Sequence, residues 1–481
     1  MTLPLRSLTL TVTSRCNLRC RYCYVPKDDA TSMSGDVADA AVDLLLSESE
    51  GEPTIQIAFF GGEPFLEPEL MRRAVARARS RAAPGREIAV MSPTNGLALD
   101  APGLAFARAE AMELVISIDG DSRPSDRCDA AGRDTTDELV ARLPELLELA
   151  PRCRLVARMT VTPTNAARLS AHVRALYRLG FERIVYQPAY EREWPDDAVA
   201  AWKREHGRIG TWLVGLASAG RRLPDLGPWK AIEHKMLLGR QRAHCGAGVR
   251  VAAVATDGTL YPCYRFAAEQ ARAYRLGDVR SGFTEVERLA ELAALEPGRL
   301  RPELGDCASC ASRDGCGHFC PATGALLAGD LLAVPSVVCR LVRAQVEAIR
   351  PYAALERRPR TASRWSKTLL AAAMAGAAAA SCGGKEDGPS GAGDAQVTPD
   401  GSALSDASDA YLPEGPVTID GGGGGVCPVQ VDSGIGPGIC APAIDAGGGG
   451  GGLCNVFVDS SIGPGVCVEQ PDSGSVGGIC R

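Results

Sequence analysis

Short apolar runs alternate with longer amphipathic stretches through the first half of the chain. The short runs are rich in β-branched and aromatic residues and lie at 7–13, 55–60, 87–91, 113–118, 155–161 and 183–186. The longer stretches, at 36–46, 67–82, 137–149 and 166–179, carry apolar residues at helical spacing. Strands that alternate with helices predict a parallel sheet with right-handed crossovers. Six such units predict an α/β fold, an open partial (β/α)6 barrel, with its chemistry at the carboxyl ends of the strands.

Three cysteines directly follow the first predicted strand, in the segment Cys16-Asn-Leu-Arg-Cys20-Arg-Tyr22-Cys23. Protein iron–sulfur clusters are usually held by four cysteinates. Three thiols at this spacing can therefore hold three irons of a [4Fe–4S] cluster and leave the fourth open to another molecule. Taken alone, the segment also fits a structural zinc site or a set of redox thiols.

Glycines and polar residues follow the next predicted strands. Gly61-Gly62-Glu63-Pro64 follows the second strand, Pro93-Thr94-Asn95-Gly96 the third, and the fourth ends in Ser117-Ile118-Asp119-Gly120. Arg158 lies within the fifth, otherwise apolar strand, where a charged side chain requires an anionic partner. Each feature alone has an ordinary explanation, such as a turn glycine or a buried ion pair. Their succession behind the cysteine segment indicates one shared site.

This succession resembles the radical SAM superfamily, in which S-adenosylmethionine (SAM) coordinates the open iron of the cluster. The resemblance implies that Tyr22 packs on the adenine, and that the glycine–glutamate segment holds the SAM ammonium group. Ser117 and Arg158 would meet its carboxylate and ribose. The implied SAM-contacting residues are Tyr22, Gly61, Gly62, Glu63, Asn95, Ser117 and Arg158. No residue receives a catalytic role.

A second group of cysteines begins after residue 235, where the strand–helix alternation stops. Seven cysteines, at the positions of Cys245, Cys263, Cys307, Cys310, Cys316, Cys320 and Cys339, resemble the SPASM domain of radical SAM peptide-modifying enzymes. The resemblance implies two auxiliary [4Fe–4S] clusters. One would be bound by Cys245, Cys263 and Cys320, and the other by Cys307, Cys310, Cys316 and Cys339. The family's extra ligand to the first cluster is missing from 246–254, which implies an open iron. A zinc ribbon is the alternative.

One position departs from the anaerobic sulfatase maturases, which share this architecture. They carry a proton-accepting aspartate directly after the cysteine that matches Cys263, whereas this chain has Tyr264. The departure disfavours oxidation of a sulfatase residue as the reaction.

Composition narrows the class of protein further. The chain has 481 residues, 18 cysteines and a net charge of −6, and residues 361–481 carry 13 acidic and 4 basic side chains. The remainder lacks the strongly basic surface of a nucleic-acid-binding protein. Residues 1–13 resemble a lead-in and first strand rather than a secretory signal, which predicts a cytoplasmic enzyme. An electron donor such as a ferredoxin or flavodoxin is expected. Cys128 and Cys153 fit no pattern and are predicted to be buried thiols.

A signal-like segment follows residue 350. Residues 357–367 are basic, 368–380 are rich in alanine and leucine, and Ala379-Ala-Ser-Cys382 ends the run. This is the order of a lipoprotein export signal, although it lies in mid-chain. The apolar run is short for a membrane span, and an alanine-rich linker helix is the alternative. Membrane association is predicted only through 365–382.

A low-complexity tail, residues 383–481, is rich in Gly, Ser, Asp and Pro and is predicted to form no core. Four of its cysteines each precede an aspartate by five residues. The pairs are Cys427 with Asp432, Cys440 with Asp445, Cys454 with Asp459, and Cys467 with Asp472. Disulfides formed after export, with Asp-Ser-Gly turns between them, are the alternative interpretation.

These observations predict four parts: a radical SAM core (1–235), an auxiliary-cluster domain (236–350), a linker (351–382) and the tail (383–481). We interpret the chain as a radical SAM peptide maturase whose substrate is a cysteine-rich peptide, with residues 427–480 of its own tail as the candidate. No segment before the cluster loop is long enough for a leader-binding domain, which a tethered substrate would not need. The alternatives are an exported lipoprotein tail or two joined reading frames, with the enzyme acting on another protein.

Overall fold

The computed structural model describes residues 4–27, 31–120, 125–149, 151–238, 245–296, 299–316 and 320–353. The chain divides into two compact units, Met1–Glu386 and Asp387–Arg481. All described residues lie in the first unit. The predictions for the signal-like run and for the cysteine repeats of the tail fall outside the described residues.

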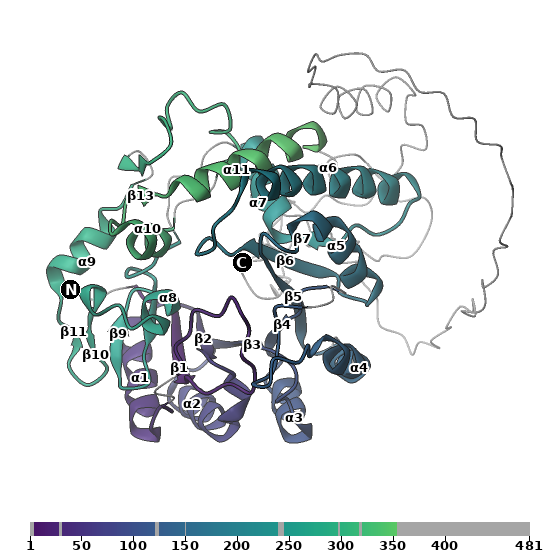
Figure 1. Cartoon of the computed structure of the whole chain (residues 1–481). Helices are drawn as coiled ribbons and strands as arrows, with labels where there is room; N and C mark the ends of the chain where they lie inside the picture. Colours follow the sequence, from purple (N-terminus) through teal and green to yellow (C-terminus); the bar gives the residue numbers. More distant parts are fainter. Residues whose placement is uncertain are drawn as a thin grey trace, which may run out of the picture. The chain divides into compact units, whose positions relative to one another are not determined.

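A curved sheet forms the centre of the first unit (Figure 1). Seven of its strands pair in parallel and in chain order. They are β1 (Ser7–Thr13), β2 (Thr54–Gly61), β3 (Glu87–Thr94), β4 (Glu113–Ser117), β5 (Arg154–Val161), β6 (Arg183–Pro188) and the short β7 (Asp225–Leu226). This arrangement confirms the predicted α/β class and the partial barrel. All six predicted strands are present.

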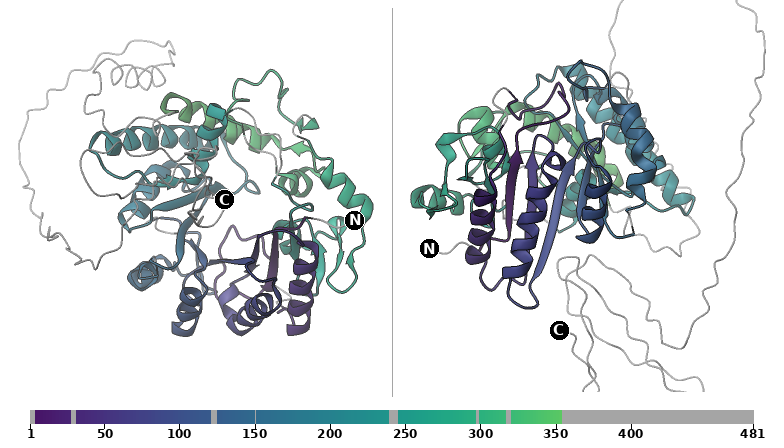
Figure 2. Two further views of the ribbon diagram at one scale, coloured as in Figure 1. Left: turned by 180° about the vertical axis from the view of Figure 1, so that it is seen from behind. Right: turned by 90° about the horizontal axis from the view of Figure 1, so that it is seen from below.

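Helices connect the parallel strands, and α1 to α4 lie along the outer side of the sheet (Figures 1 and 2). They are α1 (Gly35–Glu48), α2 (Pro68–Arg81), α3 (Ala101–Ala109), α4 (Thr136–Leu147), α5 (Leu169–Arg178) and α6 (Asp196–Ser218). Polar caps mark where some of them begin: Ser34 Oγ accepts from the backbone N–H of Val37 (3.3 Å), and Asp100 Oδ1 from that of Gly103 (2.8 Å). Buried side chains from both layers, Leu8, Leu10, Ile55 and Ile57 among them, form the core.

The C-terminal region extends the sheet from the other edge of β1. Strand β8 (Val251–Val254) pairs with β1 in parallel, and β9 (Thr259–Tyr261), β10 (Gly277–Asp278) and β11 (Gly282–Phe283) continue it antiparallel. The other elements are α7 (Gly227–Leu238), α8 (Tyr264–Ala268), α9 (Val286–Ala293), α10 (Pro321–Ala328), α11 (Ser336–Ile349) and the paired β12 (Arg301–Pro302) and β13 (Ala333–Val334). The pairing of β8 with β1 was not predicted. It brings the second cysteine group beside the first strand.

The last helix, α11, packs against α6. The indole Nε1 of the buried Trp202 donates to the carbonyl of Leu341 (3.1 Å). This hydrogen bond links two helices that lie far apart in the sequence. The domain boundary near residue 235 stays a prediction. Within the part of the chain that the structure describes, every helix is too short or too polar to span a lipid bilayer.

Candidate cofactor site at the strand tips

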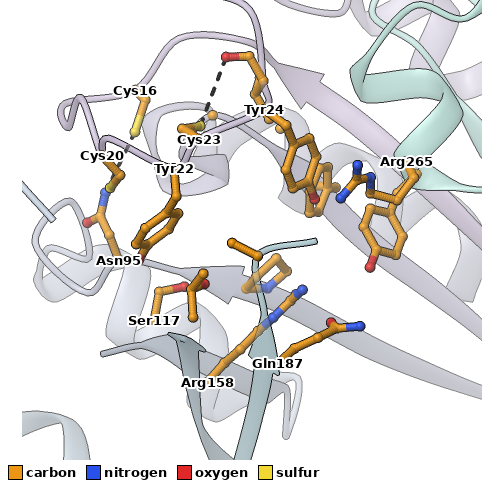
Figure 3. A pocket seen from close by; sticks show the side chains of 18 of the residues that line it. Cys16, Cys20, Tyr22, Cys23, Tyr24, Asn95, Ser117, Arg158, Gln187 and Arg265 are labelled. Carbon is orange, nitrogen blue, oxygen red and sulfur yellow. Dashed lines mark hydrogen bonds between the residues drawn. The ribbon is translucent and has the colours of Figure 1, made fainter. Parts of the chain in front are cut away.

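A cavity of about 210 Å³ lies at the carboxyl ends of β1 to β6. Thiols of the cluster loop, defined here as residues 14–27, line one part of it, and Tyr264, Arg265 and Cys320 of the C-terminal region line another. All seven residues predicted to contact SAM line this cavity: Tyr22, Gly61, Gly62, Glu63, Asn95, Ser117 and Arg158. Figure 3 shows Ser117 and Arg158 on the side opposite Cys16, Cys20 and Cys23. The structure brings these residues together, and their individual roles remain predictions.

The cluster loop is held by its own backbone and by the tip of β3. The N–H of Leu18 points at Cys16 Sγ (3.3 Å), and the N–H of Cys23 donates to the carbonyl of Cys20 (3.1 Å). Asn95 Nδ2 donates to Asn17 Oδ1 (2.7 Å) and lies 3.9 Å from Cys16 Sγ. The predicted residue Asn95 therefore contacts the loop that presents the thiols.

The three thiols of the cluster loop have the chemistry of iron–sulfur ligands. Cys16, Cys20 and Cys23 are free and line a single cavity. Among the described residues, no three His, Cys, Asp or Glu side chains converge closely enough for a single metal ion. Burial raises the pKa of Cys16, and raises that of Cys20 to about 11. The thiolates that iron requires must therefore be stabilised by the bound metal or by nearby cations.

Two glycines bring the tip of β2 against the cluster loop. Gly61 has φ +140°, and a Cβ on it would lie 1.8 Å from the carbonyl oxygen of Thr13. A Cβ on Gly62 would lie 2.0 Å from the carbonyl oxygen of Arg15. The N–H groups of Gly62 and Glu63 donate to these two carbonyls, each at 2.8 Å. The close approach of the two backbones therefore requires glycine at both positions, as the sequence predicts.

Glu63 joins the tips of β2 and β3. Its side chain is buried and accepts from Thr94 Oγ1 (2.8 Å), the N–H of Asn95 (2.7 Å) and the N–H of Phe65 (3.2 Å). Burial raises its pKa to about 7, and these donors act in the opposite direction. A ligand ammonium beside it would favour the carboxylate form further. The residues present therefore fit the amino group of SAM.

Arg158 is a cation in the cavity wall without a carboxylate partner among the described residues. Its guanidinium donates to the phenol of Tyr264, and the Tyr24 ring lies nearby. Since an ionised group in a partly buried site favours an anionic partner, this geometry fits a ligand carboxylate. Tyr264 also packs on Phe60, with ring centroids 4.7 Å apart.

Several lining residues were not predicted. Arg265 ion-pairs with Glu191 and Glu269, each at 2.6 Å, and its guanidinium lies 4.0 Å from the centroid of the Tyr24 ring. Figure 3 shows the Arg265 guanidinium beside the Tyr24 ring. Arg127 and Gln187 also line the cavity. Nothing in the local sequence marked these side chains, because their position depends on contacts between distant segments.

The auxiliary cysteines lie in two neighbourhoods. The charges of Cys320 and Cys245 act on the Cys263 thiol, and burial raises the Cys263 pKa to about 12. The charges of Cys307, Cys316 and Cys310 act on Cys339, whose pKa burial raises to about 11. None of the seven forms a disulfide within the described residues. The division of these cysteines into two cluster-binding sets remains a prediction.

The two unassigned cysteines are buried, as predicted. Cys153 Sγ donates to the carbonyl of Ala107 (3.3 Å). Cys128 Sγ donates to the carbonyl of Arg19 in the cluster loop (3.0 Å). Cys128 therefore supports the loop that presents the thiols.

A partial parallel barrel whose strand tips surround three free thiols, a glycine–glutamate turn and a partly buried arginine is the arrangement that the resemblance to radical SAM enzymes predicts. The comparisons agree, because residues 10–175 match the Radical SAM superfamily. Residues 10–175 therefore form a radical SAM domain, and the predicted resemblance to radical SAM enzymes is confirmed. The match supports SAM and a [4Fe–4S] cluster as its cofactors.

Several known proteins are similar to this chain. The serine-type anaerobic sulfatase-maturating enzyme of Klebsiella aerogenes is 24% identical over 346 residues, which span 66% of this chain and 80% of that enzyme. The cysteine-type enzyme of Clostridium perfringens is 24% identical over 306 residues, 58% of this chain and 78% of that enzyme. The structure of anSMEcpe with bound AdoMet and Kp18Cys peptide has a TM-score of 0.60 at 19% identity, covering 77% of this chain and 100% of that one. This structural likeness shows a shared fold.

Proposed function

We propose that this radical SAM enzyme modifies a cysteine-containing peptide by forming a thioether bond, with the help of two auxiliary [4Fe–4S] clusters. The observation that carries the proposal is the extent of the cavity. It runs from the thiols of Cys16, Cys20 and Cys23 to Cys320 and Tyr264 at the edge of the auxiliary cysteines. A substrate group within it can therefore approach both the SAM position and the first auxiliary set.

Likeness to enzymes that act on proteins supports a peptide substrate. The relatives include serine-type and cysteine-type sulfatase-maturating enzymes. The anSMEcpe structure, which shares this fold, contains both bound AdoMet and the Kp18Cys peptide, and this supports a peptide partner. We infer a peptide partner for this chain on the same grounds.

The protein would orient SAM and keep water from the reacting atoms. When bound, the reduced cluster and SAM supply a 5′-deoxyadenosyl radical, and this chemistry belongs to the cofactors. Glu63 would hold the SAM ammonium group, and Arg158 and Ser117 its carboxylate and ribose. Tyr22 would pack on the adenine. The buried donors around Glu63 fix that carboxylate in place before SAM binds.

The thioether reaction is a two-electron oxidation of the peptide. One C–H bond and one S–H bond break, and one C–S bond forms. The SAM-derived radical would accept the hydrogen atom, the thiol proton would leave to solvent, and an auxiliary cluster would supply the acceptor for the remaining electron. The first auxiliary set, Cys245, Cys263 and Cys320, would leave an iron open for the substrate thiolate. A ferredoxin or flavodoxin would supply the electron that starts SAM cleavage.

Oxidation of a sulfatase residue to formylglycine is the second candidate, favoured by the relatives. Tyr264 speaks against it, because a phenol bound to Arg158 stands where the sulfatase maturases carry a proton-accepting aspartate. A phenol is a far weaker base than a carboxylate at neutral pH.

The proposed substrate is the chain's own repeat region, 427–480, and the modification would take place in the cytoplasm. A flexible tether raises the effective concentration of a peptide toward the millimolar range. An exported lipoprotein tail, or two joined reading frames with another protein as substrate, are the alternatives.

Anaerobic reconstitution tests the proposal. The protein should bind about twelve irons, the content of three [4Fe–4S] clusters. Replacing Cys16, Cys20 and Cys23 by alanine should remove about four irons and abolish SAM cleavage, whereas Cys153→Ala, at a thiol far from both sets in sequence, should change neither. The intact mass of the tail after incubation with SAM and dithionite reports the reaction. Release of 5′-deoxyadenosine by the triple variant would overturn the assignment of the cluster loop.

A further inference from the structure

The segment after β4, residues 125–128, lies along the cluster loop. The N–H of Arg19 donates to the carbonyl of Cys128 (2.7 Å), and the N–H of Arg21 donates to the carbonyl of Asp126 (2.9 Å). These two bonds pair the segment with the loop as in a short strand ladder. Arg127 lies between the two pairing residues of the segment, and its side chain lines the cofactor cavity.

Arg127 is held in place by a buried network. Its Nε lies 3.1 Å from Asp119 Oδ2, and the two side chains are 11% and 4% exposed. The Tyr22 phenol donates to the same carboxylate oxygen (2.6 Å), and the N–H of Thr160 donates to Asp119 Oδ1 (2.8 Å). The Arg127 guanidinium carbon lies 5.5 Å from the centroid of the Tyr22 ring. Asp119 thus connects β4, β5, Arg127 and the cluster loop.

Arg127 lies beside the thiols that would hold the cluster. Its side chain lines the same cavity as Cys16, Cys20 and Cys23, and its guanidinium lies over the ring of Tyr22, which stands between Cys20 and Cys23 in the sequence. Charges in a buried site interact more strongly than they do across water, because little solvent screens them. Arg127 is therefore a buried cation in the wall of the cavity that the three thiols also line.

A cation at this place has a consequence for electron transfer. A [4Fe–4S] cluster that gains one electron gains one negative charge, so a nearby fixed cation stabilises the reduced form. Hydrogen bonds, net charge and solvent exposure around a cluster are known to set its reduction potential. A nearby charge can therefore shift the reduction potential while the cysteine ligands stay the same.

We propose that Arg127 raises the reduction potential of the cluster bound by Cys16, Cys20 and Cys23, and that the carboxylate of its ion-pair partner Asp119 acts in the opposite direction. One electron from a low-potential donor, such as dithionite or a flavodoxin-class protein, reduces the cluster, and Arg127 compensates the charge that is added. Arg127 is thus a positioning and electrostatic residue rather than a catalytic one. The inference rests on cluster binding at the proposed site.

Redox titration followed by electron paramagnetic resonance tests the inference on the reconstituted full-length protein. Arg127→Gln should shift the midpoint to a more negative potential, and Arg127→Lys, which keeps the charge, should stay near the wild type. Asp119→Asn, which removes the opposing charge, should shift the midpoint in the positive direction. Arg21→Gln is the matched control. The Arg21 side chain lies on the same loop and is 55% exposed, so solvent screens its charge. The midpoint potential of the cluster should therefore be unchanged in this variant.

Two results separate the inference from the function on which it rests. If the wild type binds no cluster, the assignment of the site itself fails. If the wild type and Arg127→Gln both hold their irons and share one midpoint, the function stands and the role of Arg127 is overturned. Should Arg127→Gln lose iron, Arg127→Lys and Asp119→Asn still decide, because the inference requires the first to match the wild type and the second to rise.

Discussion

The side-chain amide nitrogen of Gln345 lies 3.0 Å from Nε2 of His206, inside the contact between α6 and α11. His206 Nδ1 lies 2.7 Å from the carbonyl oxygen of Trp202. This geometry assigns a neutral ring that donates from Nδ1 and accepts at Nε2. The ring is fully buried and packs on Trp202, with centroids 4.4 Å apart.

His206 should make stability depend on pH in the acidic range. Burial lowers its pKa from 6.5 to about 4, so between these values the folded state binds fewer protons than the unfolded state. The free energy of unfolding therefore rises with pH. The stabilisation is present above about pH 6.5 and is lost as the pH falls through about 4, at a cost of up to about 3 kcal/mol.

Urea unfolding followed by circular dichroism at pH 7 and pH 5 measures this dependence. His206→Gln should reduce the difference between the urea midpoints at pH 7 and pH 5, even if it lowers both of them. His234→Gln, at an exposed position on α7, is the control and should keep the wild-type difference. An unchanged pH difference in His206→Gln would contradict the assignment.

Gly61 and Gly51 provide a matched pair for the cofactor site. Both have positive φ, but an added Cβ meets the Thr13 carbonyl at 1.8 Å in the first and nothing within 4 Å in the second. Gly51→Ala should cost about 1 kcal/mol of stability from backbone strain alone. Gly61→Ala must also move the cluster loop, so SAM affinity should fall at least about tenfold, equivalent to 1.4 kcal/mol. Equal SAM affinity in the two variants, measured by isothermal titration calorimetry, would show that this close approach is not needed.

Alternation of apolar runs and amphipathic stretches was sufficient to predict the barrel. The first strand has the predicted bounds, Ser7–Thr13, because its apolar run ends where the polar cluster loop begins. Helix α3 was missed, since Pro102 and Gly103 in its first turn resemble a loop. The structure shows instead an Asp100 cap followed by proline at a permitted position.

Contacts between distant segments were beyond the reach of sequence patterns. Strand β8 pairs with β1, and the two are separated by more than half of the described chain. No local sequence pattern indicates that they pair. Arg127 likewise looks no different in sequence from the exposed Arg133 close behind it. The cysteine spacings allow ligand sets to be predicted from sequence because a metal cluster imposes a local geometric requirement on its ligands. The arginines are specified only by the folded cavity.

The first auxiliary set should be needed for peptide modification but not for SAM cleavage. Cys245→Ala removes one thiol from the neighbourhood of Cys263 and Cys320 and leaves the cluster loop untouched. Modification of a tail peptide should therefore stop, while 5′-deoxyadenosine release continues within a few-fold of the wild type. Cys16→Ala is the contrasting variant and should lose both activities. Loss of both in Cys245→Ala, with its other clusters intact by iron count, would assign the auxiliary region a structural role only.

The cysteine–aspartate spacing of the tail leads to the most specific prediction. A carbon radical at an aspartate β-position is stabilised by the adjacent carboxyl group and can be captured by a thiolate. A separation of five residues closes a small loop, whose entropic cost is modest in a turn-prone sequence. We therefore expect thioether rings from Cys427 to Asp432, Cys440 to Asp445, Cys454 to Asp459 and Cys467 to Asp472, with Cys480 left as a free thiol.

Tandem mass spectrometry of the tail after turnover checks this expectation ring by ring. Each ring should remove two hydrogens, block alkylation of its cysteine and suppress fragmentation within the spanned residues. Asp459→Ala should abolish only the ring at Cys454, because each ring needs its own acceptor carbon and the repeats are otherwise independent. Ser460→Ala, next to that aspartate, is the control and should retain all four rings. If every cysteine still alkylates after turnover while SAM is consumed, the tail is not the thioether substrate, and an exported tail or a separate protein substrate becomes the better interpretation.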